Sequence, residues 1–364
     1  MNTGKLWNIF CRVIDNYGDI GVCWRLSAEL AARGHRVRLW VDDPAPLAWM
    51  APGGAVGVEV RHWTTTIDTG GLEIGEILIE AFGCDIAPEF IAAYARCTRE
   101  SGKPSIWVNL EYLSAERYVE RCHGLPSPVI SGPGAGLTKE FFYPGFTCTT
   151  GGLLRETDLI GLQNKFNRIT WLRQLGIPYQ GERLVALFCY EPPALEGLLT
   201  QFANDPQATR LMVTAGRATA AVQACLEALK QSQLLWNRQG CLTFSFLPPL
   251  TQIEFDHLLW TCDLNFVRGE DSLVRALWAN KPFVWQIYPP DDCAHHEKLA
   301  AMLAVLNAPP SWREFHELWN GITQGVLPQL DLTLWQPTVT DARALLLQQD
   351  DQVERLLKFV TKNH

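Results

Sequence analysis

The sequence predicts an α/β protein with two domains, each a parallel sheet covered by helices. Short apolar runs rich in β-branched and aromatic residues alternate with helical patterns along most of the chain, and this alternation is typical of parallel sheets. A length of 364 residues fits two domains at about 100–200 residues each. Hydrophobic residues make up 47% of the chain, which is enough to fill two cores.

The first half opens with a strand, a loop and a helix. Residues 6–13 form an apolar run, a turn-rich segment covers 15–19, and helical periodicity extends over 22–33 up to a glycine that can end the helix. A strand over 36–41 completes a βαβ unit, whose crossover should be right-handed. The other elements expected in this half are strands over 56–63, 76–82 and 105–110 and a helix over 88–99.

A boundary between the domains is expected near residue 178. Residues 124–152 are rich in glycine and proline and are predicted to be a long irregular stretch. A helical pattern over 158–175 follows and stops at the Gly-Ile-Pro segment that ends at Pro178, a typical helix terminus. We therefore expect an N-terminal domain over 1–178 and a C-terminal domain over 179–347.

The second half repeats the alternation, so both halves are expected to be Rossmann-like. Its predicted strands cover 184–189, 210–214, 242–247, 263–267 and 282–285, and its predicted helices cover 195–202, 218–231, 252–260 and 272–279. The pattern is helical from 292 onward. The last segment, about 348–364, is an amphipathic helix that can pack on either domain, including back on the N-terminal one.

Composition argues against several classes of function. The formal net charge is -8 and no run of Lys and Arg forms a basic patch, so nucleic acid is not an expected partner. No apolar run approaches the ~18 residues of a membrane span, and the N-terminal residues lack the pattern of a signal peptide. We therefore expect a cytoplasmic protein with no membrane contact.

The cysteines and histidines do not predict a metal site. The 11 cysteines lie no closer than the 12 residues between Cys11 and Cys23, so the chain has no CxxC pair, and it has no HExxH motif. We expect reduced thiols, as is usual in the cytosol.

The first candidate for chemistry is the loop from Asp15 to Asp19, directly after the first strand. Ligands of open parallel sheets bind beyond the carboxyl ends of the strands, and a helix N-terminus nearby favours an ionised carboxylate. The loop lacks GxGxxG, which argues against dinucleotide binding. An equally good interpretation is structural: Asp15 and Asn16 form an Asx turn and Asp19 caps the first helix.

The second candidate is the segment Arg268-Gly269-Glu270-Asp271-Ser272, which follows another strand and opens another helix. Asp271 or Ser272 is a candidate N-cap, and the free amides at the helix start form an anion site. The Arg268 guanidinium beside them suits a phosphate or a carboxylate. A simple capped helix explains the spacing equally well.

An ordered set of sequence strings resembles one known family. The chain is similar to EarP, the bacterial protein-arginine rhamnosyltransferases that modify translation elongation factor P. The resemblance rests on IFCRVIDNYGDIGVCWRL (9–26), NLEYLSAE (109–116), GGLLRE (151–156) and CDLNFVRGEDSLVRA (262–276), with the shorter strings LPSP (125–128), PPLTQ (248–252) and FVWQIYP (283–289). Each string alone is weak, but their order over nearly the whole chain is specific.

This resemblance implies a GT-B fold, in which two Rossmann-like domains face each other across a cleft. It implies that the N-terminal domain takes the acceptor, elongation factor P, and that the C-terminal domain takes a nucleotide sugar. The implied donor is dTDP-β-L-rhamnose, and the implied reaction inverts the anomeric carbon without a metal ion or another cofactor.

The resemblance also implies roles for individual residues. Asp19 matches the general base, and Asp15 and Glu270 match its supporting carboxylates. The residues expected to bind the donor, including the loop at Arg268, are Phe188, Tyr190, Gln252, Arg268, Gly269, Asp271, Ser272 and Tyr288. Pro249 replaces a phenylalanine found in some relatives, so the residue that stacks on the thymine stays open, with Phe246 as a nearby substitute.

Six residues of the first half are expected to face the acceptor: Asn16, Tyr17, Gly18, Asn109, Glu111 and Tyr112. The last three follow a predicted strand, and a purely structural hydrogen-bonding role is an equal alternative for them.

Two other functions stay open at this point. Two Rossmann-like lobes also suit a non-catalytic module that binds a nucleotide sugar, although such a module would not need several carboxylates near the sugar. A GT-B glycosyltransferase could instead act on a glycan or a lipid, since a fold does not identify a substrate.

Overall fold

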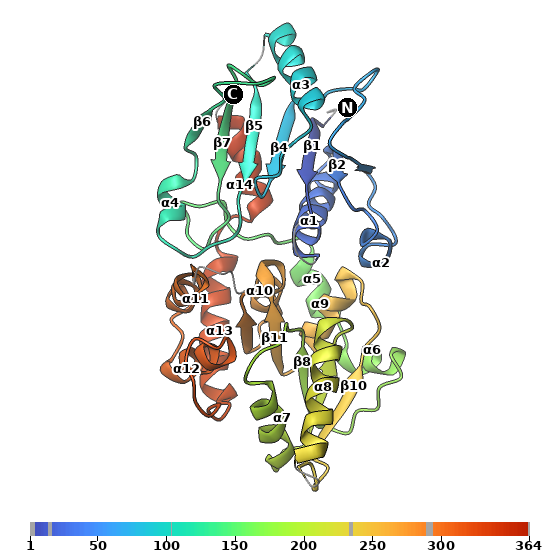
Figure 1. The fold of residues 1–364 in the computed structure, drawn as a ribbon, viewed down its shortest axis with the longest axis vertical. Helices are drawn as coiled ribbons and strands as arrows, with labels where there is room; N and C mark the ends of the chain where they lie inside the picture. The colour runs from blue at the N-terminus through green and yellow to red at the C-terminus, as the bar shows by residue number, and fades with distance from the viewer. Residues whose placement is uncertain (1–3, 14–16, 103, 233–235, 289–293, 363–364) are drawn as a thin grey trace. The chain divides into compact units, whose positions relative to one another are not determined.

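The chain divides into two compact units, and each is described by itself. Unit 1 comprises Met1–Leu159 and Gln349–His364, and unit 2 comprises Ile160–Gln348. The computed structural model in Figure 1 describes residues 4–13, 17–102, 104–232, 236–288 and 294–362. No helix within these ranges is long and apolar enough to cross a membrane.

Unit 1 is built on a mainly parallel sheet. Its described strands lie in the order β3 (Val58–His62), β2 (Arg36–Val41), β1 (Leu6–Cys11), β4 (Ile77–Ala81), β5 (Ile106–Leu110), β7 (Thr138–Phe142) and β6 (Pro126–Pro128). Only β6 pairs antiparallel, with β7. The five strands expected up to residue 110 are confirmed. The prediction that residues 124–152 are irregular is wrong at β6 and β7. Prolines are tolerated on an edge strand such as β6, so their presence did not exclude a strand there.

Helices cover both faces of this sheet (Figure 1). Side chains alternate across a strand, so one core contains α1 (Gly18–Ala32) and α14 (Gln352–Lys362) and the other contains α3 (Pro88–Ser101). Leu356 of α14 is fully buried in the first core, and Phe90 of α3 is fully buried in the second. The short helices are α2 (Leu47–Met50) and α4 (Tyr118–Cys122).

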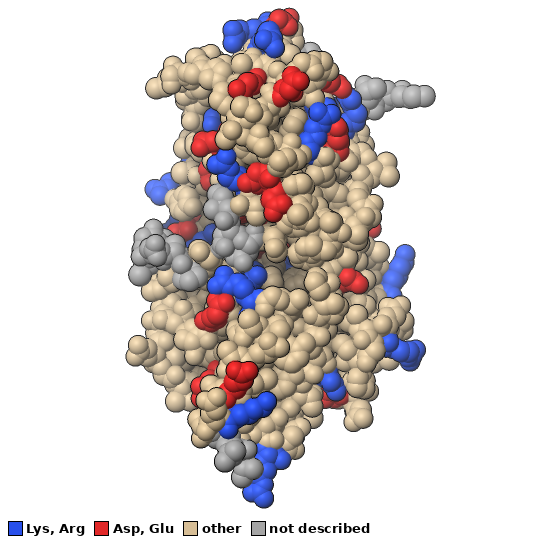
Figure 2. Space-filling model, turned by 45° about the vertical axis from the view of Figure 1, so that its right-hand side comes forward, with Lys and Arg blue, Asp and Glu red and all other residues tan. Residues whose placement is uncertain are grey.

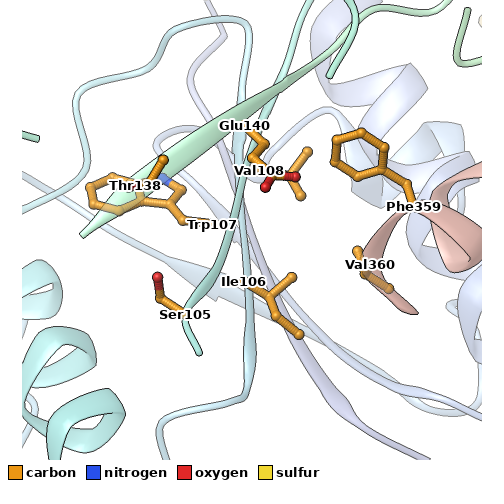
Figure 3. A pocket seen from close by; sticks show the side chains of 8 residues that line it. All are labelled: Ser105, Ile106, Trp107, Val108, Thr138, Glu140, Phe359 and Val360. Atoms are coloured by element: carbon orange, nitrogen blue, oxygen red, sulfur yellow. The ribbon is translucent and has the colours of Figure 1, made fainter. Parts of the chain in front are cut away.

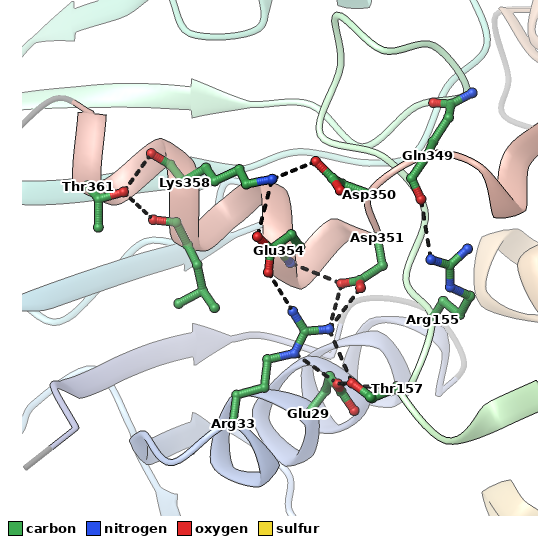
Figure 4. A network of polar contacts seen from close by, with 11 residues as sticks. Glu29, Arg33, Arg155, Thr157, Gln349, Asp350, Asp351, Glu354, Lys358 and Thr361 are labelled. Atoms are coloured by element: carbon green, nitrogen blue, oxygen red, sulfur yellow. Dashed lines mark hydrogen bonds and ion pairs between the residues drawn. The ribbon is translucent and has the colours of Figure 1, made fainter. Parts of the chain in front are cut away.

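The last helix is fixed on unit 1 by ion pairs as well as by its apolar face. Arg33, the C-cap of α1, donates to Asp351 at 2.8 and 2.9 Å and to Glu29 at 3.0 Å, as Figure 4 shows. Arg355 donates to the backbone oxygens of Thr147 and Thr150 at 2.6 and 2.7 Å. The amphipathic helix expected at the C-terminus therefore packs on the N-terminal unit.

A small cavity remains where α14 meets the sheet. It is lined by eight side chains of β5, β7, α14 and their flanks, among them Ile106, Glu140 and Phe359 (Figure 3). Its volume of about 10 Å³ is close to the minimum that holds one water molecule. This cavity is too small to be a substrate site.

Unit 2 is built on a fully parallel sheet. Its described strands lie in the order β10 (Leu242–Phe246), β9 (Thr209–Val213), β8 (Arg183–Leu187), β11 (Leu264–Arg268) and β12 (Phe283–Gln286). The five strands expected in this half are confirmed within a few residues. The helices are α5 (Leu159–Lys165), α6 (Arg168–Gln174), α7 (Leu195–Asn204), α8 (Arg217–Ser232), α9 (Gln252–Thr261), α10 (Gly269–Ala279), α11 (Ala294–Val305), α12 (Pro310–Trp319) and α13 (Leu332–Leu347).

The boundary between the units lies at residues 159–160 and not at 178. Two helices replace the single helix expected over 158–175, because Asn167 caps α6 by accepting from the Thr170 amide at 2.9 Å. The rings of Phe166 and Trp171 lie beside His257 of α9, with centroids 4.8 and 6.3 Å away. These contacts place α5 and α6 with unit 2.

Charged side chains are intermixed on the surface. On the face shown in Figure 2, Lys and Arg lie in small groups among Asp and Glu. The described residues on this face therefore form no continuous basic stripe of the kind that tracks nucleic-acid phosphates.

A buried histidine connects β12 to α12. Nε2 of His316 accepts the Trp285 backbone N–H at 2.9 Å, and Nδ1 lies 2.9 Å from the Trp312 backbone oxygen. Since Nε2 must be an acceptor, the proton is on Nδ1, which donates to Trp312. Burial lowers the pKa of His316 to about 4, so the folded chain holds a neutral ring.

We predict that the free energy of unfolding falls as the pH drops below about 6.5, the usual pKa of histidine. Between that pH and about 4 the unfolded chain takes up a proton at His316 that the folded chain excludes. Denaturant titrations at pH 7 and 5.5 should show a contribution of about 1 kcal/mol. A His316→Gln variant should be less stable but should lose this contribution, and an unchanged pH dependence in the variant would contradict the assignment.

Candidate functional site

Each sheet has one point where the order of strand addition reverses. In unit 1 this point lies between β1 and β4, and in unit 2 it lies between β8 and β11. Ligands of open α/β sheets bind outside the carboxyl ends of the strands at such points. Asp19 lies in the first turn of α1, after β1, Tyr190 follows β8, and Arg268 is the last residue of β11. The predicted site residues therefore lie where the topology favours a site.

The centre of the unit 2 site is the guanidinium of Arg268. It lies over the ring of Phe188 at 4.4 Å and over the ring of Tyr190 at 4.6 Å from the centroids. Its Nη1 donates to the backbone oxygen of Cys189 at 3.1 Å. Burial lowers the pKa of Arg268, although an arginine still stays protonated. A cation that has lost part of its hydration in this way is suited to bind an anion.

Helix α10 begins beside this guanidinium. The N-cap residue is Arg268, which makes no side-chain cap, so the expectation that Asp271 or Ser272 is the N-cap is wrong. The hydroxyl of Ser272 instead accepts from the Arg268 amide at 3.0 Å and donates to the Arg268 backbone oxygen. Gly269 has a φ of +66°, which favours glycine. The turn thus leaves the first amides of α10 without a side-chain cap.

Tyr288 and the first turn of α9 add to the cluster from two other elements. The Tyr288 ring packs edge-on against Tyr190 with centroids 5.6 Å apart. The backbone N–H of Tyr190 donates to Gln286 at 2.8 Å. Gln252 is the first residue of α9, and Phe255 of the same first turn packs on Phe188 at 5.2 Å. Four segments that are distant in sequence therefore meet around two aromatic rings.

Three residues of this cluster were not predicted. Arg217 lies 4.8 Å from the centroid of the Tyr190 ring, and its guanidinium pairs with Glu191. Phe255 contacts Phe188 as described above. The signal that could have identified Arg217 is its place after the second strand of this half, at the start of the next helix.

Glu270 has a cationic partner within unit 2. Lys298 of α11 donates to its Oε1, and both side chains are about four-fifths buried. Asp271 follows in the first turn of α10 and is half-buried. The pair places a positive charge next to the carboxylate that was expected to support catalysis.

The unit 1 site centres on Asp19. It lies in the first turn of α1 and is 7% exposed, and the N-cap is Tyr17, so the interpretation of Asp19 as the helix cap is wrong. A hydrogen bond with Cys11, burial and the negative charge of Asp19 all raise the pKa of the Cys23 thiol one turn further on. Asp15 and Asn16 lie outside the described residues.

The other residues expected to face the acceptor differ in exposure. Tyr17 is 48% exposed and packs edge-on against Trp49 at 5.5 Å. Gly18 is the exposed first residue of α1. Tyr112 is partly exposed and stacks on the Phe82 ring at 4.5 Å. Aromatic side chains with exposed faces are frequent in protein interfaces.

Asn109 and Glu111 form a hydrogen-bonded pair at the end of β5. Nδ2 of Asn109 donates to Glu111 Oε1 at 2.9 Å. The side chain of Asn109 is buried, and its Oδ1 has no partner among the described residues. Burial, with a smaller contribution from Glu80, raises the pKa of Glu111. The structural hydrogen-bonding role that was an equal alternative from the sequence is therefore present. Oδ1 of Asn109 can still accept a hydrogen bond from a ligand.

Comparison with known proteins gives consistent results over the whole chain. The family model for Elongation-Factor P (EF-P) rhamnosyltransferase EarP matches residues 7–361. A protein-arginine rhamnosyltransferase from Pseudomonas putida is 44% identical over 82% of this chain and 80% of its own length. The corresponding enzyme from Pseudomonas aeruginosa is 42% identical over 86% of both chains. These relatives lend no support to a non-catalytic module or to a glycan or lipid acceptor.

Solved structures agree with the sequence relatives. A structure described as the basis for EarP-mediated arginine glycosylation of translation elongation factor EF-P superposes with a TM-score of 0.65 at 28% identity, over 99% of this chain and 100% of that one. The calicheamicin glycosyltransferase CalG4 has a TM-score of 0.51 at 12% identity over 99% of both chains, which shows the fold alone. The expected GT-B class of fold is confirmed. The chain belongs to the EarP family of elongation factor P rhamnosyltransferases.

Proposed function

We propose that this protein transfers rhamnose from dTDP-β-L-rhamnose to an arginine side chain of elongation factor P, with inversion at the anomeric carbon. The observation that carries the proposal is the unit 2 cluster, in which a largely buried guanidinium, two aromatic rings and an uncapped helix N-terminus come together. A nucleoside diphosphate offers matching groups, since its phosphates suit the cation and the amides and its base suits the rings.

In this proposal the donor is held by unit 2. The diphosphate binds at Arg268 and at the first amides of α10, with the hydroxyl of Tyr190 as a further donor. The thymine lies near Phe188 and Gln252, where the first turn of α9 begins. Donors fixed before the reaction stabilise the negative charge that develops on the leaving diphosphate, so the reaction is proposed to need no metal ion.

The acceptor nitrogen needs help to become a nucleophile. A guanidinium has a pKa far above neutral pH, and its lone pairs are delocalised. We assign Asp19 as the general base that orients this nitrogen and takes its proton as the bond to C1 of rhamnose forms. The bond from C1 to the diphosphate oxygen breaks, and its electron pair leaves with dTDP. Asp15 and Glu270 are assigned to balance the charge of the guanidinium.

Unit 1 is proposed to recognise a folded acceptor. The exposed ring faces of Tyr17 and Tyr112 and the Asn109–Glu111 pair offer contacts for a protein surface with basic side chains. A stable complex of this kind buries about 1,200–2,000 Å², which a short peptide does not supply. The enzyme is proposed to act in the cytoplasm, where translation factors work.

Mass spectrometry of intact acceptor tests the proposal. Purified elongation factor P is incubated with this protein and dTDP-β-L-rhamnose, and we expect one added deoxyhexose on one arginine. An acceptor variant with that arginine replaced by lysine is the control and should stay unmodified. No mass gain with active donor, or transfer to a glycan or lipid in its place, would refute the function.

We predict that Asp19→Asn lowers turnover by about 10²–10⁴, the usual loss on removing a general base. The amide keeps the size of the side chain but cannot accept the proton. Because Asp19 is not the N-cap of α1, the melting temperature should change little, and dTDP affinity should also be unchanged. Near-normal turnover in Asp19→Asn together with its loss in Glu270→Gln would reverse the two assignments.

We predict that Ser272→Ala weakens dTDP binding only modestly and lowers the free energy of unfolding by about 1 kcal/mol. Both hydrogen bonds of the hydroxyl go to the backbone of Arg268, so its removal loosens the turn that presents Arg268. Calorimetry and denaturant unfolding measure the two effects. Tyr190→Ala should weaken dTDP more, and unchanged affinity in both variants would rule out this donor site.

A further inference from the structure

We propose that Arg217 is a second cation for the diphosphate of the donor, and that Glu191 holds the Arg217 guanidinium in place while the donor is absent. The inference rests on the proposed function, because it takes the donor to be a nucleoside diphosphate sugar. It adds a binding residue from α8 to the contacts already assigned to Arg268 and α10.

Two guanidinium groups lie close to the same aromatic ring. Arg217 lies 4.8 Å from the centroid of the Tyr190 ring, and Arg268 lies 4.6 Å from the same centroid. They come from different strand ends, since Arg217 follows β9 and Arg268 ends β11. A ring attracts a cation, but two cations near one ring repel each other. A ligand with more than one negative charge relieves that repulsion.

The electrostatics of Arg268 agree with this geometry. Burial is the main cause that lowers its pKa, and the positive charge of Arg217 lowers it further. The two cations are therefore close enough to affect each other. The Glu191 carboxylate acts in the opposite direction and raises the pKa of Arg268, so it offsets part of this repulsion while it is paired with Arg217.

The Arg217 guanidinium is held by the carboxylate of Glu191. Its Nε donates to Glu191 Oε1 at 2.9 Å, and its Nη2 donates to the other carboxylate oxygen. The two side chains are 42% and 56% exposed. Exposed ion pairs contribute little stability and are screened by salt. The Glu191 carboxylate can therefore be exchanged for a diphosphate at small cost.

Glu191 is also placed to act as such a temporary partner. It follows Tyr190 directly in the chain, so the pair fixes the Arg217 guanidinium beside the ring. The hydrogen bond from Arg217 lowers the pKa of Glu191, which keeps the carboxylate ionised at neutral pH. Both partners are thus charged before the donor arrives.

Calorimetry with dTDP on the full-length protein tests this inference. Arg217→Ala should bind dTDP about 10- to 100-fold more weakly, as expected for a lost hydrogen bond to a charged group. Arg217→Lys should recover part of the affinity, because it keeps the charge but not the planar fork. Glu191→Gln should bind dTDP up to about fivefold more tightly, since it removes the competing carboxylate.

Thymidine, which has no phosphate, separates a diphosphate contact from a general loss of the site. Its affinity, measured by ligand-observed NMR, should differ less than twofold between the native protein and Arg217→Ala. Equal losses for thymidine and dTDP would overturn the inference, because they would indicate damage to the base site or the fold. An unchanged dTDP affinity in Arg217→Ala would also overturn it.

A matched pair in unit 1 supplies the control. Arg36 and Glu73 form an ion pair with both side chains 57% exposed, at 2.9 and 2.6 Å, and neither belongs to the site. Arg36→Ala and Glu73→Gln should leave dTDP affinity unchanged. If the native protein itself fails to bind dTDP, the proposed donor is wrong. If it binds dTDP and Arg217→Ala binds equally well, only this inference fails.

Discussion

The reversal of strand order within each sheet is the constraint on which both candidate sites depend. Parallel strands end at one edge, and crossovers of one hand place helices on opposite faces on the two sides of the reversal. The loops after the two central strands therefore lead to opposite faces of the sheet. The carboxyl ends of these two strands are left open to a ligand. Asp19 lies after β1, and Tyr190 and Arg268 lie after β8 and β11, next to these reversals. The chemistry is set by loop residues, while the sheets fix where those residues meet.

Within unit 2 the residues of the site pack around the Arg268 guanidinium. The guanidinium contacts Phe188 and Tyr190 after β8, and the backbone of Arg268 is the N-cap position of α10, so this one residue joins two strand ends. A buried cation is costly unless it is paired. The rings and a backbone oxygen offset only part of that cost, and a diphosphate would offset the remainder. The burial that makes this cation costly would therefore favour an anionic ligand.

Sequence patterns predicted the sheets well because buried parallel strands are continuous apolar runs. The strand pattern also indicated Arg268, which directly follows such a run, whereas Phe188 and Tyr190 were expected only from the resemblance to the EarP family. Arg217 was missed, because a lone Gly-Arg after a strand has no motif and its contact with Tyr190 exists only in three dimensions. The domain boundary at 178 failed for the same reason, since the contacts of Phe166 with α9 decide it. The cap predicted at Asp19 was wrong by two residues, because the N-cap of α1 is Tyr17.

We propose that unit 2 binds the donor nucleotide and that unit 1 contributes the base. Amide hydrogen exchange with and without dTDP distinguishes the two roles. We expect slower exchange over 184–191 and 264–275 in unit 2, with no change over 17–24 in unit 1. Protection over 17–24 without protection at either unit 2 segment would contradict it.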